Sequence, residues 1–220
     1  MQWAKDNSLT IVLMVIFTGV LIGQGLSGWA YNNEERIGHG QAALPLLAYL
    51  RGPDFLSALF ENWESEFLQM GAYVLLTASL IQRGSAESKD PDAPDDEAAV
   101  AAATPDPLKP WPARLPQGDW RRTLYEHSLG TVLLLLFAAS FVLHWVNSAH
   151  AAAEEAVMHG QAPLGVWAYL AAPQLWFESF QNWQSEFLST AVLVVLSIWL
   201  RQKHSPESKP VSAPHTSTGA

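Results

Sequence analysis

The chain has 220 residues, of which 49% are hydrophobic and 15% are charged, whereas about 25% of residues are charged in soluble domains. The formal net charge of -9 at pH 7 provides no basic patch for phosphates, so we expect no nucleic-acid partner. The absence of cysteine excludes disulfides, thiolate chemistry and cysteine-ligated zinc. Long apolar blocks separated by polar segments are typical of an integral membrane protein.

The first apolar block, residues 9–30, predicts a transmembrane helix. It has about 22 residues without a charge, which at about 1.5 Å per residue cover a hydrocarbon layer of about 30 Å. A secretory signal peptide is the alternative, but this run is longer than the usual 7 to 15 or so apolar residues and no clear cleavage site follows it. Gly19 and Gly23 have the spacing that lets two membrane helices approach closely.

A polar and then apolar connection, residues 31–53, follows the first span. Its apolar part is too short to cross a membrane, and we expect it to lie along the surface. A second long helix is predicted to begin near Pro53, because proline fits the first helical turn, and to end at Gln82. Since about 20 residues cross a bilayer, its spanning part is predicted at about 63–82.

Residues 84–122 are rich in Asp, Glu, Ala and Pro. They hold too few apolar side chains to offset the entropy lost on folding, so we predict a disordered acidic linker. An extended recognition motif around Trp111 is the alternative. Residues 204–220 are predicted to form a disordered tail.

The second half of the chain repeats the first at a constant offset of 120 residues. About 30 of roughly 83 aligned positions are identical without a gap. The repeats are therefore predicted at 1–83 and 123–203, with the spans of the second at about 129–149 and 183–200. The clearest copies are Phe60-Glu61-Asn62-Trp63-Glu64-Ser65-Glu66-Phe67-Leu68 with Phe180-Gln181-Asn182-Trp183-Gln184-Ser185-Glu186-Phe187-Leu188, and His39-Gly40-Gln41-Ala42 with His159-Gly160-Gln161-Ala162.

Basic residues indicate the orientation of the four predicted spans. The opposite loops hold only Arg36 and Arg51, so the positive-inside rule predicts that both termini and the linker are cytoplasmic. The predicted fold class is an all-α integral membrane protein with four transmembrane helices, built as two parallel tandem repeats of a two-span hairpin with amphipathic extracytoplasmic connections. The basic residues that flank the predicted inner ends are Lys5, Arg83, Lys89, Arg121, Arg122, Arg201, Lys203 and Lys209.

Three pieces of the sequence resemble those of a bacterial membrane-protein family that is catalogued only as a domain of unknown function. The resemblance covers both repeats and implies a small multi-pass protein of the bacterial inner membrane. It implies no activity, substrate or catalytic residue. The three pieces are Phe60-Glu61-Asn62-Trp63-Glu64-Ser65-Glu66-Phe67-Leu68-Gln69-Met70, Gln82-Arg83-Gly84-Ser85-Ala86-Glu87-Ser88-Lys89 and the nonapeptide at 180–188.

Polar residues at the predicted outer boundary form a candidate site. A carboxylate near hydrocarbon is unfavourable unless it is paired, protonated or hydrated, and such a residue is a site candidate by default. The favoured interpretation is that Glu66 and Glu186 turn outward or cap a neighbouring loop. The more specific hypothesis, which their recurrence at the offset of 120 suggests, is that they face each other near the pseudo-two-fold axis. The candidate polar cluster comprises Asn62, Glu66, Asn182, Glu186, His39, His159 and His144.

Two of the three histidines of this cluster follow a glutamate at a spacing of four residues, which places each pair on one face if the loops are helical. Gly38 and Gly40 disfavour a regular helix there, and the spacing differs from the Glu-x-x-His of di-iron bundles. We therefore expect no metal and no cofactor, and predict local hydrogen bonds that respond to external pH. The two pairs are Glu35 with His39 and Glu155 with His159.

Recognisable catalytic patterns are absent: there is no Gly-x-Ser-x-Gly elbow, P-loop, His-Glu-x-x-His or dinucleotide fingerprint, so we do not expect an enzyme. The predicted function is a non-enzymatic structural or interaction protein of the envelope, because no span holds a charge near its midpoint. The alternative is a small oligomeric transporter or channel-like subunit that holds a cation or proton with Glu, Asn and His. The lipid bilayer is the predicted partner, and both homo-oligomerisation and protein partners are left open.

Overall fold

The computed structural model describes residues 2–93 and 96–219, and for 96–99 it describes the backbone alone. Within the described residues the chain is helix, turn and coil without a β-strand, so the prediction of an all-α fold is confirmed. The chain divides into two compact units. Unit 1 comprises Met1–Phe60 and Leu143–Ala172, and unit 2 comprises Glu61–Val142 and Pro173–Ala220.

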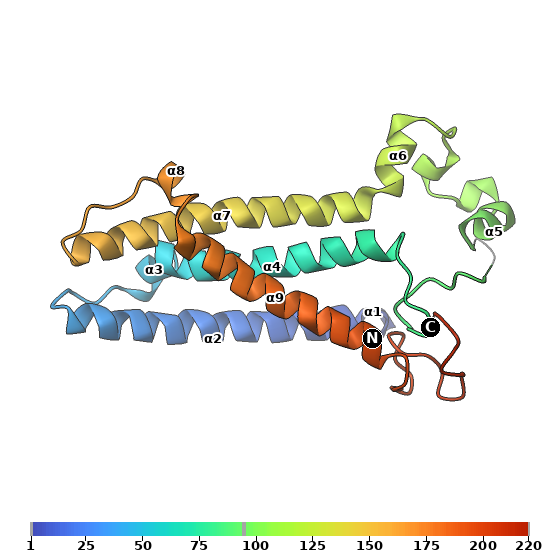
Figure 1. Ribbon diagram of the computed structural model, residues 1–220, viewed down its shortest axis with the longest axis horizontal. Helices are drawn as coiled ribbons and strands as arrows, with labels where there is room; N and C mark the ends of the chain where they lie inside the picture. Colours follow the sequence, from blue (N-terminus) through green and yellow to red (C-terminus); the bar gives the residue numbers. More distant parts are fainter. Residues whose placement is uncertain (1, 94–95, 220) are drawn as a thin grey trace. The chain divides into compact units, whose positions relative to one another are not determined.

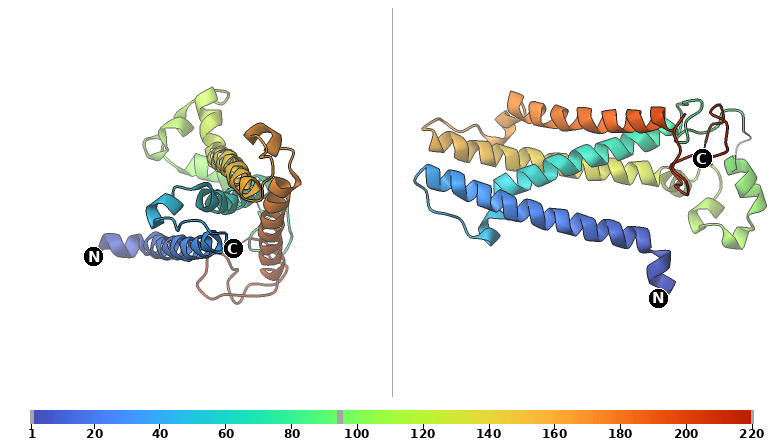
Figure 2. Two further views of the ribbon diagram at one scale, coloured as in Figure 1. Left: turned by 90° about the vertical axis from the view of Figure 1, so that its left-hand side faces the viewer. Right: turned by 90° about the horizontal axis from the view of Figure 1, so that it is seen from below.

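Unit 1 is built around the 31-residue helix α2 (Ser8–Gly38), which the short helix α1 (Gln2–Asp6) precedes. After α2 the chain turns back, and α3 (Leu46–Tyr49) lies beside it (Figures 1 and 2). The Trp29 indole nitrogen donates to the Leu44 carbonyl at 2.7 Å, which holds the returning loop against the helix.

Two glycines of α2 lie against α3 and the residue that follows it. A methyl group at Gly28 would collide with the hydroxyl of Tyr49, and one at Gly25 would lie 3.0 Å from Leu50. Tyr49 is buried. The absence of side chains at these two positions therefore allows the close approach.

The end of α2 differs from the prediction. The helix continues to Gly38, whereas the connection was expected to begin at residue 31. The reason is a glycine cap: Gly40 takes the left-handed conformation (φ 74°), and the Gln41 amide donates to the Arg36 carbonyl at 2.8 Å, the bonding pattern of a Schellman motif.

Helix α7 (Ser128–Met158) begins in unit 2 and ends in unit 1. It has 31 residues like α2, and its bounds equal those of α2 shifted by 120, as do those of α8 (Val166–Tyr169) relative to α3. Both predicted first spans, 9–30 and 129–149, thus lie inside continuous helices.

Unit 2 contains most of α4 (Pro53–Thr77) and all of α9 (Pro173–Leu196), which crosses α4 (Figures 1 and 2). Small residues again permit close packing: a methyl group at Gly71 of α4 would lie 3.3 Å from Leu134 of α7. One turn further along the same side of α7, the rings of Phe137 and Trp183 meet edge to face at a centroid distance of 6.0 Å.

Helix α4 ends at Thr77 and α9 at Leu196, before the predicted ends of their spans at 82 and 200. In both places the following residues form the same turn, in which Ser88 Oγ accepts from the Gln82 amide and Ser208 Oγ accepts from the Gln202 amide, each at 2.9 Å. Each serine hydroxyl oxygen accepts a hydrogen bond from a backbone amide that a helix would pair with a backbone carbonyl.

The turn requires a left-handed residue two positions after the glutamine. That residue is Gly84 (φ 85°) in the first copy and His204 (φ 71°) in the second. Glycine adopts this conformation without strain, whereas histidine adopts it at a cost of about 1–2 kcal/mol. The repeated motif at 82–89 and 202–209 is therefore a structural turn.

Lys209, at the end of the second turn, is 1% exposed. Its ammonium group donates to the carbonyls of Gly84, Pro214, His215 and Ser217. Burial lowers the pKa of Lys209, and nearby Arg201 lowers it further. The carbonyl cage joins the segment after α9 to the first turn.

Between Gly84 and Arg122 the structure has short helices separated by turns. Residues 94 and 95 of the predicted linker lie outside the described residues, and the disorder of the linker and of 204–220 stays a prediction. The helices here are α5 (Asp96–Ala103), η1 (Asp106–Leu108), η2 (Trp111–Arg114) and α6 (Trp120–Glu126).

Two of the described helices, α2 and α7, are long and apolar enough to cross a membrane. The remaining described helices, including α4 and α9, do not meet the same criteria of length, hydropathy and charge. The predicted membrane-length helices at 9–30 and 129–149 are therefore confirmed as candidates, and the four-span arrangement stays a prediction.

Candidate functional site: a polar seam between α4 and α9

Hydrogen bonds between side chains join α4 to α9 along their crossing within unit 2. We call this set of residues the polar seam. Its α4 members carry the carboxylates and an amide, and its α9 members supply most of the donors. The pairs are Asn182 with Glu61, Ser179 and Trp183 with Glu64, and Gln69 with Thr190.

Glu64 is the most enclosed member of the seam, with 0% of its surface exposed. Its Oε1 atom accepts from Ser179 Oγ at 2.9 Å and from Trp183 Nε1 at 3.2 Å. Ser179 and Trp183 are four residues apart, so they project from the same face of α9 one turn apart. A buried carboxylate needs such donors, because burial without them costs several kcal/mol.

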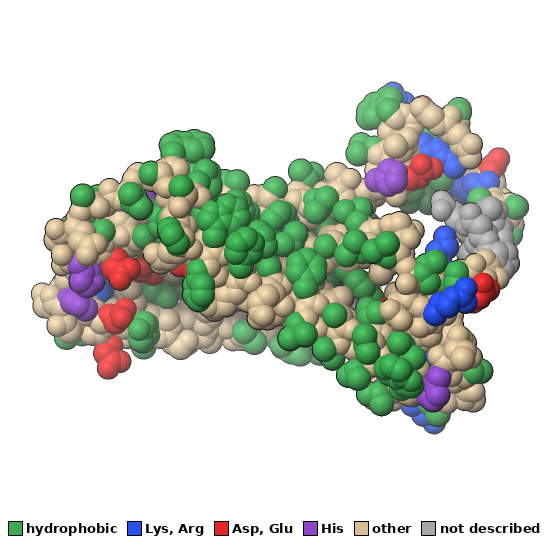
Figure 3. Space-filling model, in the orientation of Figure 1, with side chains coloured by type: hydrophobic (Ala, Val, Ile, Leu, Met, Phe, Trp, Pro, Cys, Tyr) green, Lys and Arg blue, Asp and Glu red, His purple; other side chains and the backbone are tan. Residues whose placement is uncertain are grey.

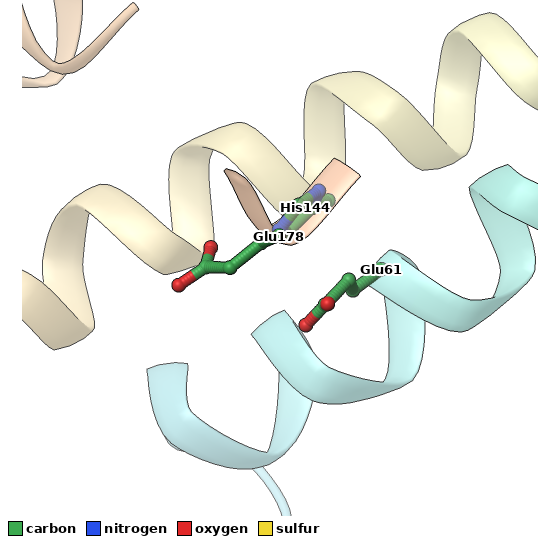
Figure 4. A group of neighbouring side chains, drawn as sticks. All are labelled: Glu61, His144 and Glu178. Carbon is green, nitrogen blue, oxygen red and sulfur yellow. The ribbon is translucent and has the colours of Figure 1, made fainter. Parts of the chain in front are cut away.

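Glu61, one turn before Glu64, brings two carboxylates together. Its Oε1 accepts from the Asn182 amide, and one of its oxygens lies within 4.8 Å of a carboxylate oxygen of Glu178 on α9. Figure 4 draws both side chains, together with His144 of α7, which belongs to unit 1. Two carboxylates this close favour a shared proton or cation.

The predicted carboxylates Glu66 and Glu186 both belong to unit 2, where Glu66 is exposed on α4 and Glu186 is half-buried on α9. The facing arrangement of the two carboxylates stays a hypothesis. Asn182 contacts Glu61, whereas Asn62 lies on the exposed side of α4.

The predicted histidines fall into two groups within unit 1. His144 is completely buried on α7. His39 and His159, from the ends of α2 and α7, contact each other edge to face with ring centroids 6.0 Å apart.

A second group of polar residues lies where α4 and α9 end. The Tyr73 hydroxyl donates to Glu87 Oε2 at 2.8 Å. Burial raises the pKa of Glu87, the Tyr73 hydrogen bond opposes this, and the nearby carboxylate of Glu207 raises the pKa further. Tyr73 and Glu87 border a cavity of about 410 Å³ that is otherwise mainly lined by apolar side chains, among them Leu76, Leu80, Phe187 and Val194.

The model of the family described as "Domain of unknown function (DUF6766)" matches residues 1–220. The chain belongs to the DUF6766 family. The predicted resemblance to a family catalogued as a domain of unknown function is thereby confirmed. No curated protein matches the chain. No solved structure matches it either.

In this DUF6766 protein the most buried seam residues were missed by the sequence reasoning. Positions were selected because they recur at an offset of 120, and Glu64 corresponds to Gln184. Glu61 likewise corresponds to Gln181, and Ser179 to Leu59. A signal was available in the charge pattern: 52–82 contains no Lys or Arg, so a glutamate that is buried there needs hydrogen-bond donors of another kind.

Proposed function

We propose that this DUF6766 protein is a non-enzymatic interaction protein of the bacterial inner membrane, with four membrane-spanning helices. The observation that supports membrane insertion is the distribution of side chains. Buried positions of unit 2 are mostly polar, and they include Glu64, Ser65, Ser140 and Ser179. Aliphatic side chains of α2 are exposed instead, for example Val15 at 68%. A water-soluble protein distributes these residue types in the opposite way.

The same distribution extends to α4 and α9. Leu75 of α4 and Val192 of α9 are exposed, whereas the seam between the two helices is polar. In hydrocarbon, interhelical hydrogen bonds hold helices together and apolar side chains contact lipid. This pattern supports α4 and α9 as the second and fourth spans. Accessibility labelling of tags at the two termini tests the topology: we expect both tags in the cytoplasm, and tags on opposite sides would refute it.

The interaction role is supported by a second glycine pair on α2. Gly25 and Gly28 are covered by their own unit, but a methyl group at Gly19 or Gly23 would meet no described atom within 4 Å. At 3.6 residues per turn the two pairs lie on roughly opposite faces of α2. A face with this small-xxx-small spacing suits close contact with another membrane helix. We propose that its occupant is α2 of a second copy of the chain.

Crosslinking in membranes and native mass measurement of the purified protein test this role. We expect wild-type dimers, and we expect Gly19→Leu and Gly23→Leu to reduce the dimer fraction at least about tenfold, because leucine separates the two helices. Val20→Leu is the matched control, since Val20 is 66% exposed on a neighbouring face and should tolerate the change. A monomeric wild type, or dimers in both glycine variants, would refute the contact.

A second candidate function is a proton- or cation-holding transport subunit. It is favoured by the close carboxylates of Glu61 and Glu178 together with the buried Glu64. Proteoliposome flux of protons and monovalent cations distinguishes the two. The transport function requires flux that Glu64→Gln abolishes and that the exposed-site control Glu34→Gln retains. The interaction function predicts no flux that depends on a carboxylate.

A further inference from the structure

The two histidines of the His-Gly-Gln motifs lie together in unit 1. His39 follows the last residue of α2, and His159 follows the last residue of α7. Their ring centroids are 6.0 Å apart and the rings are inclined by 71°. Figure 3 shows histidine side chains next to each other, with acidic side chains nearby, at the left end of the molecule.

Both imidazoles are held by the same local geometry. His39 Nδ1 lies 2.9 Å from the Glu35 carbonyl oxygen, and His159 Nδ1 lies 2.9 Å from the Glu155 carbonyl oxygen. A carbonyl oxygen only accepts, so in the neutral ring Nδ1 carries the proton and Nε2 carries the lone pair. Each ring therefore offers Nε2 as a metal ligand, with its tautomer already set.

The glycine after each histidine stabilises this arrangement. Gly40 (φ 74°) and Gly160 (φ 67°) are both left-handed, and in both copies the following glutamine amide donates to the carbonyl five residues earlier at 2.8 Å. The caps set the position where each helix ends, and hence the position of each histidine. Backbone hydrogen bonds thus set where each ring begins and hold its Nδ1 atom in place.

The separation of the rings is close to that of two imidazoles on one shared ion. With Zn–N bonds of about 2.0–2.1 Å and tetrahedral coordination, the two ring centroids are about 5 Å apart. The 6.0 Å separation of His39 and His159 therefore requires the two exposed rings to approach each other by about 1 Å. Both histidines are exposed, which gives an ion and its water ligands access.

The surrounding charge also favours a cation. The last turns of the two helices carry four glutamates near the pair and a single arginine, Arg36. An excess of negative charge raises the local concentration of cations. The four glutamates are Glu34, Glu35, Glu154 and Glu155.

We propose that the Nε2 atoms of His39 and His159 together bind one divalent transition-metal ion, either zinc or copper(II). The site departs from the prediction that the histidines have only local partners. The metal site does not depend on the proposed interaction role. The dimer contact involves Gly19 and Gly23 within α2, whereas His39 follows the end of that helix. On the predicted topology the site faces the outside of the cell membrane.

Metal titration of the full-length protein, purified in detergent and freed of metal by chelation, tests the site. We expect one Zn²⁺ per chain by calorimetry, and a Cu²⁺ electron paramagnetic resonance spectrum with two nitrogen ligands. Each of His39→Ala and His159→Ala should weaken binding at least about tenfold, since one ion needs both rings. Binding should also weaken in acid, because protons compete for the ring nitrogens.

His204→Ala is the matched control, because His204 belongs to unit 2, and it should leave the high-affinity site unchanged. Far-UV circular dichroism checks that the variants keep their helix content. The proposal fails if no Zn²⁺ binds, if either alanine variant binds as tightly as the wild type, or if each variant keeps half of the sites at full affinity.

Discussion

Replacing Glu64 by leucine removes the acceptor of two buried hydrogen bonds in the polar seam. The Ser179 hydroxyl and the Trp183 indole N–H both donate to Glu64 Oε1. Interhelical hydrogen bonds in membranes contribute about 0.6 kcal/mol on average and about 1.7 kcal/mol at most, so the two bonds amount to roughly 1–3 kcal/mol. Donors left buried without an acceptor add to this loss.

We therefore expect Glu64→Leu to lower the free energy of unfolding by about 2–4 kcal/mol. Glu64→Gln keeps an acceptor oxygen in the same place and has a counterpart in Gln184 of the second repeat, so its effect should stay within about 1 kcal/mol. The difference between the two variants measures the hydrogen bonds, because both remove the carboxylate.

The assay is reversible unfolding of the purified protein in mixed micelles, followed by far-UV circular dichroism and tryptophan fluorescence. Glu66→Leu is the control, since Glu66 lies on the exposed side of the same helix and should unfold like the wild type. A Glu64→Leu protein as stable as the wild type would refute the reasoning. So would a Glu64→Gln protein as unstable as Glu64→Leu.

Three further predictions concern other contacts. Lys209→Met removes the ammonium group that donates to the carbonyl cage, so it should lower the free energy of unfolding by about 2 kcal/mol and speed cleavage of residues 204–219 by a non-specific protease. Lys89→Met is the control, because Lys89 is the exposed counterpart in the first copy. Burial raises the pKa of Asp54 above 3.8, so the folded state binds its proton more tightly and stability should fall as the pH rises from 3.8 through the raised value. Asp54→Asn should remove that fall in pH-dependent unfolding. Gly28→Ala should lower the melting temperature, corresponding to about 1–3 kcal/mol of overpacking, whereas Gly23→Ala should not.

Each of these has a result that would contradict it. Equal protease resistance of the Lys209→Met and wild-type proteins would show that the carbonyl cage does not retain the segment. A pH profile of unfolding that is identical with and without Asp54 would rule out its contribution. Equal melting temperatures for Gly28→Ala and Gly23→Ala would mean that α3 moves aside without cost.

The histidine pair illustrates how far sequence reasoning reaches. The motif was recognised, and the spacing of glutamate and histidine was noted, but Gly38 and Gly40 were both taken to disfavour a regular helix before the histidine. In the structure α2 includes Gly38, and Gly40 is the residue that ends it. Glycine identity alone does not reveal which of two glycines has the left-handed conformation, because that depends on which carbonyls the following amides reach.

The polar seam shows a different limit. Recurrence at an offset of 120 selects positions that are alike in the two repeats, and Glu66 with Glu186 was found in this way. The seam instead pairs unlike residues, with acceptors on α4 and donors such as Ser179 on α9. Helical periodicity predicts which residues share a face, but the rotation and register of two crossing helices decide which faces meet.

The amino-acid sequence by itself determined the all-helical class, the two long apolar helices and the membership of a single family over 1–220. Apolar runs of membrane length without charges leave the backbone few ways to satisfy its hydrogen bonds other than a helix. Only the tertiary structure decided that Glu64 is enclosed while Glu66 is exposed, and that His39 meets His159. Those outcomes depend on contacts between residues more than a hundred positions apart, which no local pattern specifies.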